Sequence, residues 1–144
     1  MKLFTIGFTQ TTAESFFARL LDAGVARVLD TRVHRDGQLA GFAKARDLEY
    51  FLRELAGAAY RAVPELAPTP ELLARYRDRG IDWDTYAAQY AALLDERRPE
   101  TTISAELLDG GCLLCSEPTP VHCHRRLAAE YLAAKHPGLE VVHL

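Results

Sequence analysis

The segment Cys112–Lys135, CLLCSEPTPVHCHRRLAAEYLAAK, carries the clearest structural signal in this chain. Its first four residues form a short apolar run that predicts a buried β-strand, and the proline-containing residues 116–120 are typical of a turn. Residues 122–135 have leucine and tyrosine at helical spacing and predict a helix. A strand, a turn and a helix in this order are the repeating unit of parallel α/β sheets.

The rest of the chain continues this alternation of strands and helices. Short apolar runs that predict strands lie at residues 3–6, 25–29, 57–63 and 139–143. Segments that predict helices lie at residues 12–23, 48–55, 72–79, 83–97 and 101–108, and a polar loop is predicted at 33–45. We therefore expect a single α/β domain over residues 1–144. Its mostly parallel sheet of about five strands should carry helices on both faces, the three-layer arrangement of Rossmann and flavodoxin-like folds.

Composition limits the classes of partner. The chain has 144 residues, 26% of them charged, and a formal net charge of -3. Proteins that coat nucleic acid usually carry a broad basic excess, so nucleic acid is a disfavoured partner, although a local basic patch could hold a phosphate. No segment approaches the roughly 18 apolar residues of a membrane helix. Three cysteines without an export signal favour a reduced, cytoplasmic protein with no membrane association, and the sequence does not predict an oligomeric state.

Polar residues follow the predicted strands where the strands end. Ligands of parallel α/β proteins bind at these carboxyl ends, near the point where the strand order reverses. This rule selects residues that are distant in sequence and should converge in space: Gly7, Thr9, Asp30, Arg32, Glu65, Cys115 and Glu117. Gly7 would allow a tight turn or a close approach of another backbone segment.

Cys123, His124 and Arg125 begin the helix that follows the last of these strand ends. With Pro120 at the first helical position, all three lie in the first turn, where free amide groups and the helix dipole favour an anion. The same field would lower the pKa of Cys123 and make its thiolate a nucleophile, with His124 as proton carrier. Alternatively, Cys123 is a small buried apolar residue and His124 a helix-cap residue.

Asp30 and Arg32 are two residues apart and should lie on one side of their strand end. Arg32 and Arg125 would bind the phosphate or carboxylate group of a substrate, and Asp30 would orient Arg32 or act as a base. A purely structural ion pair is the alternative. Glu117 would act as nucleophile or base, and together with Glu65 it could supply paired carboxylates for acid–base chemistry.

Other cysteine chemistries are disfavoured by spacing. A tyrosine-phosphatase loop needs an arginine at a fixed distance after its cysteine, and Ala129 stands at that distance from Cys123. Cys112 and Cys115 are three apart in a strand, so their side chains should point to opposite faces. Adjacent residues such as His122 and Cys123 should also diverge. A zinc site is suggested by Cys112, Cys115, His122, Cys123 and His124, but these arguments oppose it, as they oppose a thioredoxin-like pair, and we predict no metal and no cofactor.

The segment 75–98 alternates arginines, among them Arg75 and Arg77, with acidic residues. Such mixed charge is typical of a solvated helix face, and we assign it no function. In the same segment Tyr86, Tyr90 and Leu94 recur at helical spacing and should pack in the core.

Several of these residues together resemble the family known as domain of unknown function 488. The matching pieces are Thr5-Ile6-Gly7, Leu29-Asp30-Thr31-Arg32, Tyr60 through Pro64-Glu65-Leu66, and Leu114-Cys115-Ser116-Glu117 leading to Cys123-His124-Arg125. The resemblance implies a compact α/β fold and no established activity, with nucleic-acid repair or base processing as one expectation. In two places the chain departs from the family pattern: Phe8 replaces a usual histidine, and Val33-His34 follow Asp-x-Arg where the family tends to have a proline. If the histidine that Phe8 replaces takes part in catalysis in the family, His34 would have to occupy its place in this chain.

The sequence leads to three hypotheses about function. The first is an enzyme, a possible hydrolase or transferase, that binds a small anionic substrate similar to a nucleotide or phosphate compound. The second is a nucleic-acid-processing protein of the base-excision kind, in which Asp30, Glu65 and Glu117 act on a flipped base. The third is a non-catalytic ligand-binding or interaction module.

Overall fold

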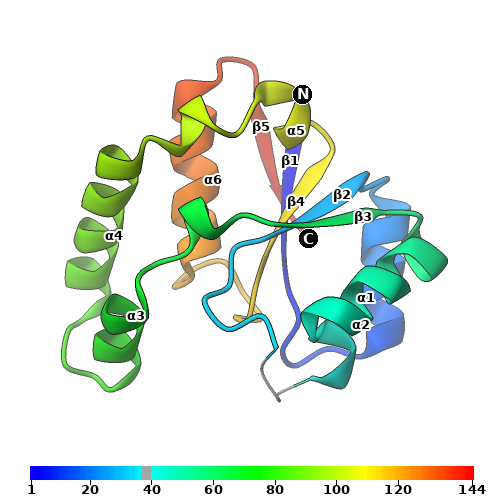
Figure 1. The fold of residues 1–144 in the computed structure, drawn as a ribbon, viewed down its shortest axis with the longest axis horizontal. Helices are drawn as coiled ribbons and strands as arrows, with labels where there is room; N and C mark the ends of the chain where they lie inside the picture. The colour runs from blue at the N-terminus through cyan, green and yellow to red at the C-terminus, as the bar shows by residue number, and fades with distance from the viewer. Residues whose placement is uncertain (37–39) are drawn as a thin grey trace.

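The computed structural model describes residues 1–36 and 40–144, and it places five parallel strands between two layers of helices (Figure 1). The strands are β1 (Lys2–Gly7), β2 (Arg27–Asp30), β3 (Ala59–Ala62), β4 (Gly111–Cys115) and β5 (Glu140–His143). Their order across the sheet is β3-β2-β4-β1-β5. The predicted α/β class with a parallel sheet of about five strands is confirmed.

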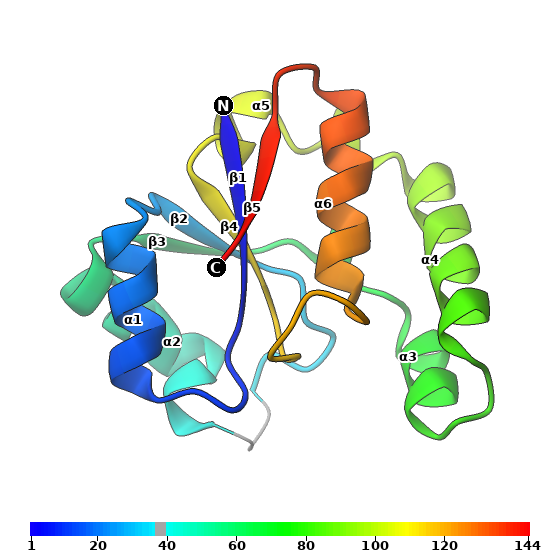
Figure 2. The same cartoon turned by 180° about the vertical axis from the view of Figure 1, so that it is seen from behind.

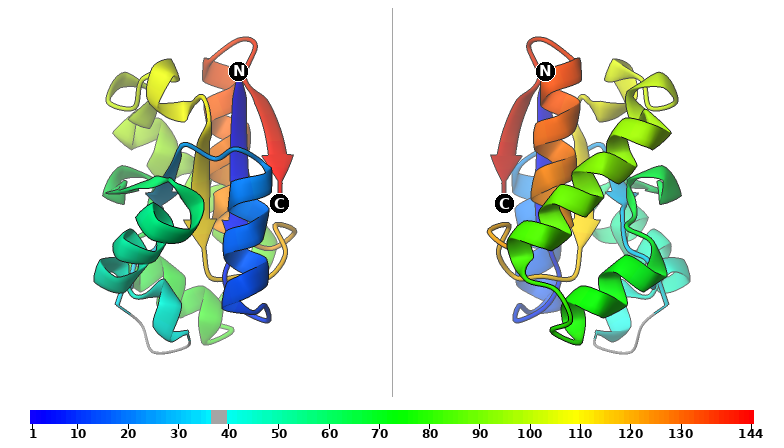
Figure 3. Two further views of the ribbon diagram at one scale, coloured as in Figure 1. Left: turned by 90° about the vertical axis from the view of Figure 1, so that its right-hand side faces the viewer. Right: turned by 90° about the vertical axis from the view of Figure 1, so that its left-hand side faces the viewer.

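The helices divide between the two faces of the sheet (Figures 1 and 3). One face carries α1 (Ala13–Asp22), α2 (Ala45–Phe51) and the π-helix η2 (Leu52–Ala56), and the other carries α3 (Pro70–Arg77), α4 (Trp83–Arg97) and α6 (His124–Lys135). Short elements complete the chain: η1 (Gly41–Ala43), η3 (Pro64–Leu66), η4 (Pro99–Thr101) and α5 (Ala105–Leu108). Part of the loop predicted at 33–45, residues 37–39, lies outside the described residues. No helix in the described parts of the chain has the length and apolarity needed to span a membrane.

Alternation along the central strands explains why both faces are covered. In β1, Leu3 packs among the side chains of α3, α4 and α6, whereas Phe4 and Ile6 pack among those of α1 and α2. In β4, Leu113 and Cys112 face these two sides in the same way. Successive strand residues point to opposite faces, so a strand buried on both sides is apolar throughout, as the sequence analysis assumed.

The strand order brings three strand ends together. β4 is inserted between β1 and β2, although it follows both in the chain, and its register places Cys115 beside Gly7 and Leu114 beside Asp30. Figure 2 shows that the loops after β1 and β4 lie at the same end of the sheet as the first turn of α6. The reversal of strand order therefore creates the kind of crevice in which parallel α/β proteins bind ligands.

Two predicted helices differ from those observed. The segment 101–108 is not one helix, because η4 ends at Thr101 and a new N-cap, Ser104, accepts the backbone N–H of Leu107 at the start of α5. The last helix begins at His124 with Cys123 as its N-cap, and Pro120 is not its first residue. Pro118 and Pro120 disfavour helical geometry in Glu117 and Thr119, and the chain from 116 to 122 is a loop of bends and turns.

Candidate functional site

A cavity of about 290 Å³ opens at the carboxyl ends of β1, β2 and β4, against the start of α6. Its lining includes these predicted site residues: Arg32, Cys115, Glu117, Cys123 and His124. It does not include the other predicted ones: Gly7, Thr9, Asp30, Glu65 and Arg125. The expected meeting of strand ends with the final helix is therefore real, but only some of the selected side chains face the space between them.

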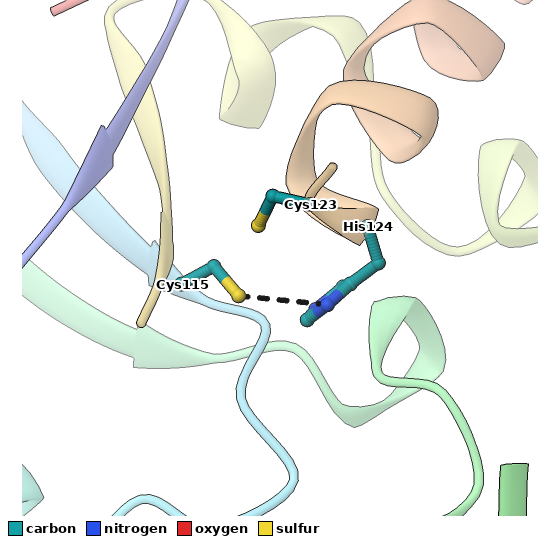
Figure 4. Close-up of side chains that lie close together, drawn as sticks. All are labelled: Cys115, Cys123 and His124. Atoms are coloured by element: carbon teal, nitrogen blue, oxygen red, sulfur yellow. Dashed lines mark hydrogen bonds between the residues drawn. The ribbon is translucent and has the colours of Figure 1, made fainter. Parts of the chain in front are cut away.

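The floor of the cavity is a cluster of sulfur and imidazole groups (Figure 4). Cys115 ends β4, Cys123 is the N-cap of α6 and His124 is the first residue of that helix. All three side chains are buried, and one donor atom from each lies within 4.8 Å of the others. The loop between β4 and α6 thus brings the sulfur of Cys115, at its start, close to the sulfur of Cys123 and the imidazole of His124, at its end.

His124 is held in one tautomer by the end of β2. Its Nε2 lies 2.9 Å from the carbonyl oxygen of Thr31 and 3.1 Å from the Thr31 hydroxyl, which itself donates to the carbonyl of Leu114. A carbonyl oxygen can only accept, so Nε2 carries the proton. Burial lowers the pKa of His124 and keeps the ring neutral. The unprotonated Nδ1 then faces the sulfur of Cys115, 3.5 Å away.

The two cysteines of the floor have opposite acidity, and the prediction of a low pKa for Cys123 is wrong. A hydrogen bond from the Cys123 thiol lowers the pKa of Cys115, helped by the charge of Arg125 and by the backbone N–H groups of Glu117 and Ser116. Burial raises the pKa of Cys123, and its contact with Cys115 raises it further. Cys123 occupies the N-cap rather than the first turn, and its side chain makes no capping bond.

Arg125 supports the floor from beneath. It is fully buried, and its Nη1 donates to the carbonyl oxygen of Glu117 at 2.6 Å and to the sulfur of Cys123 at 3.4 Å. Gly7 makes this arrangement possible, because a Cβ there would overlap the Glu117 carbonyl oxygen and lie 2.7 Å from its carbonyl carbon. The close backbone approach expected at Gly7 is confirmed. Arg125 holds the loop and the sulfur, and it does not reach the cavity.

Asp30 and Arg32 form a buried, bidentate ion pair. Nε and Nη2 of Arg32 donate to the two carboxylate oxygens of Asp30 at 2.9 and 2.8 Å, and the Tyr60 hydroxyl donates to the same carboxylate at 2.6 Å. Burial and the contact with Asp30 raise the pKa of Tyr60, so its hydroxyl stays protonated as a donor. Asp30 is therefore a positioning residue for Arg32, whose guanidinium lies 5.2 Å from the centre of the Phe8 ring at the cavity wall.

The remaining predicted residues take separate places. The Thr9 hydroxyl donates to the carbonyl of Ser116 at 2.6 Å and ties the loop after β1 to the loop after β4. Glu65 lies in η3 away from the cavity, where its carbonyl accepts a hydrogen bond from Arg97. Glu117 is exposed at the rim of the cavity. The set of three acting carboxylates expected for base excision is therefore not assembled, since Asp30 is consumed by its ion pair and Glu65 is elsewhere.

Sequence reasoning missed the wall contributed by α3 and α4. Tyr76 and Arg77 of α3 line the cavity, as does Tyr86 of α4, which was predicted only as a core residue. His122 lines it too, stacked on Trp83 with ring centroids 4.9 Å apart. Aromatic spacing along α4 was the only signal of this wall, and it cannot distinguish a core position from a cavity wall.

The floor also has the donor set of a soft metal ion. Cys112 and Cys115 face opposite sides of the sheet, as predicted, and His122 points away from the cluster to stack on Trp83. Three of the five residues weighed as zinc ligands in the sequence, Cys115, Cys123 and His124, nevertheless lie together in the structure. Adjacent residues converge here because one is the N-cap and the other begins the helix.

Comparison with known families agrees with this geometry. The family model described as "Domain of unknown function DUF488" matches residues 12–132, most of the chain. This chain belongs to the DUF488 family. No curated protein and no solved structure matches it.

The DUF488 match covers the whole floor of the cavity together with Arg32 and Arg77, whereas β1, Gly7 and Phe8 precede it. Phe8, which stands in place of the histidine usual in the resemblance, lines the cavity. His34 lines the same cavity from the loop after β2. An imidazole is therefore present in the same cavity as Phe8, supplied by the loop after a different strand.

Proposed function

We propose that this DUF488 protein is an enzyme, a hydrolase or a transferase, that binds a small anionic substrate in the cavity at the strand ends. The observation that carries the proposal is the combination of cationic walls with a floor of sulfur and imidazole in one enclosed space. Concave sites that combine apolar surface with a few convergent polar groups are the usual form of small-molecule sites.

Charge favours an anion. Arg77 of α3 lines the cavity, as do Arg32, which follows β2, and the imidazoles of His34 and His122. Nε and Nη2 of Arg32 are already bound to Asp30, so Arg77 is the arginine proposed to bind the anion. Glu117 is the acidic residue in the lining, and it sits at the exposed rim. Arginine is well suited to phosphate and carboxylate groups because it donates two parallel hydrogen bonds.

The apolar part of the lining favours a substrate with a ring. Phe8, Tyr76 and Tyr86 contribute aromatic surface, and Tyr76 stacks on Tyr86 with ring centroids 4.6 Å apart. A nucleotide combines a flat ring with an anionic group, and both features have a counterpart in this cavity. The aromatic walls also favour the second hypothesis, in which the ring is a base of a nucleic acid. The absence of a general basic excess places that hypothesis second.

Binding of a purine nucleoside monophosphate, measured by isothermal titration calorimetry, tests the substrate class. Arg77→Glu should weaken binding at least tenfold, since a hydrogen bond between charged groups contributes about 1.5–3 kcal/mol. Arg75→Glu is the matched control, because Arg75 lies on the same helix, faces Gln89 and does not line the cavity. Equal affinities for the two variants would contradict the proposal.

Turnover distinguishes an enzyme from a binding module. Incubation with a panel of nucleotides, followed by ³¹P and ¹H NMR, should show product formation that Cys115→Ala abolishes while binding persists. Binding without turnover of any nucleotide would favour the ligand-binding module instead. Binding of a short single-stranded oligonucleotide with steep salt dependence, tighter than that of the mononucleotide, would favour nucleic-acid processing.

A further inference from the structure

The cluster of Cys115, Cys123 and His124 has the composition of a zinc site. Thiolate sulfur and imidazole nitrogen are the ligands that Zn²⁺ prefers, and a set of two cysteines and one histidine occurs in catalytic zinc sites. The three donor atoms lie within 4.8 Å of one another, and all three residues line the cavity. A metal among them would therefore sit in the cavity floor rather than in the protein core.

The distances fit tetrahedral coordination. With Zn–S of about 2.3 Å and Zn–N of about 2.0–2.1 Å, a sulfur and a nitrogen bound to the same tetrahedral zinc are about 3.6 Å apart. The Sγ of Cys115 and the Nδ1 of His124 are 3.5 Å apart (Figure 4). The sulfur of Cys123 lies within 4.8 Å of both atoms and makes no capping hydrogen bond that would have to break on metal binding.

The groups around the cluster match those that support metal ligands. The Nε2–H of His124 donates to the carbonyl of Thr31, which leaves Nδ1 as the ligand atom and fixes the plane of the ring. The sulfur of Cys123 accepts a hydrogen bond from Arg125 at 3.4 Å. Metal-bound histidines almost always donate their second ring nitrogen to a carbonyl or carboxylate in this way.

The buried guanidinium of Arg125 supplies a second, independent observation. Within residues 1–36 and 40–144, its Nε and Nη2 have no hydrogen-bond partner, and its Nη1 contacts only a carbonyl and a sulfur. A buried cation needs a negative partner. Thiolates at Cys115 and Cys123 would provide that charge, and Zn²⁺ binding requires both cysteines to lose their protons.

We propose that Cys115, Cys123 and His124 bind one Zn²⁺ ion, with the fourth coordination position open to the cavity. The proposal deepens the proposed function by naming the cofactor of the same site. Three protein ligands and an open position are the arrangement of catalytic zinc, which lowers the pKa of its bound water to about 7. Glu117 at the rim is the carboxylate placed to accept a proton near that position.

Metal content and cobalt substitution test the site on the full chain. Protein purified without chelators should contain equimolar zinc, and the metal-free protein titrated with Co²⁺ should show thiolate charge-transfer bands and tetrahedral d–d bands. Cys115→Ala and Cys123→Ala should lose both signals. Cys112→Ala is the matched control and should keep both, because Cys112 is buried on the opposite face of the sheet.

A measurement on the unsubstituted protein covers the case in which a variant fails to fold. Added Zn²⁺ should protect Cys115 and Cys123 from a maleimide reagent, as located by mass spectrometry, and leave the labelling of Cys112 unchanged. Lack of bound metal, lack of cobalt bands and unchanged labelling would together overturn the inference. If the nucleotide still binds in that case, the zinc site alone is wrong. Equimolar zinc without nucleotide binding would instead support the site and overturn the proposed substrate class.

Discussion

Arg32 and Arg125 are both buried at the carboxyl edge of the sheet, and their surroundings are opposite in kind. Arg32, 4% exposed, is paired in bidentate geometry with the carboxylate of Asp30, which also accepts from Tyr60. Arg125, fully buried, contacts a carbonyl and a thiol group, and two of its nitrogens have no partner in the described part of the chain.

The two arginines differ in whether a carboxylate already compensates the buried charge. A buried charge that already has its counter-charge holds a strand end in place and leaves its partner unavailable as a base. The charge of Arg125 faces the sulfur of Cys123 instead of a carboxylate. The strength of this interaction depends on whether the sulfur is protonated or bound to a metal, so it can change when a ligand binds. The predictions below measure whether the two arginines differ in this way.

The largest effect is expected from Arg32→Met. This change leaves the buried carboxylate of Asp30 without a counter-charge, so the free energy of unfolding should fall by about 3–5 kcal/mol. Urea denaturation followed by circular dichroism gives the value. Tyr60→Phe, which removes only one hydrogen bond to the same carboxylate, should cost about 1–2 kcal/mol. An equal loss for the two variants would show that the ion pair is not the dominant interaction.

Zinc should stabilise the Arg125 region. A free metal concentration of one hundred times the Kd stabilises the folded state by about 2.7 kcal/mol if the unfolded chain does not bind it. Thermal denaturation should show a higher Tm with zinc for the unsubstituted protein and for Arg32→Met. The same addition to Cys123→Ala should leave the Tm unchanged. A zinc-dependent shift in Cys123→Ala would place the metal elsewhere.

Gly7→Ala tests the backbone contact on which the position of Arg125 depends. The added Cβ would overlap the carbonyl of Glu117, and the displaced loop should cost about 2 kcal/mol of unfolding free energy, within the range for overpacking. Gly41→Ala is the control, since no heavy atom lies within 4 Å of a Cβ built there. Identical denaturation curves for the two variants would show that the end of β1 does not require glycine at position 7.

The smallest effect is expected from Arg125→Met. The change removes the hydrogen bonds to the Glu117 carbonyl and the Cys123 sulfur, but it also removes a buried charge that has no carboxylate partner, so the metal-free protein should lose only about 1 kcal/mol. The measurement is the urea denaturation used for Arg32→Met. A loss as large as that of Arg32→Met would mean that the two arginines have equivalent surroundings.

Much of the fold was predictable from local pattern. The helix over 83–97 begins and ends where the periodicity places it, and the apolar runs became the central strands because both of their faces are buried. Boundaries set by competing local preferences were less accurate. The last helix begins at His124 rather than near Pro120. The pKa of Cys123, predicted to be lowered by the helix, is instead raised by burial and by the contact with Cys115.

The candidate site was predictable in its location and only partly in its members. The rule about strand ends selected Arg32, Cys115 and Glu117, which line the cavity, because it depends only on chain direction and strand order. The rule could not predict that Arg32 lines the cavity and Asp30 does not. That difference depends on the ion pair between the two side chains. The rule could not find Tyr76 or Arg77, because α3 reaches the site through packing between helices.

By itself, the sequence determined the alternation of strands and helices and the edge of the sheet at which polar groups gather, since both follow from periodicity and from the direction of the chain. Tertiary structure alone decided that Cys115, Cys123 and His124 meet while Cys112 is excluded, and that one buried arginine has a carboxylate while the other has sulfurs. The physical reason is that contacts between distant segments depend on loop paths and on desolvated partners, and neither is encoded in the spacing of residues along one element.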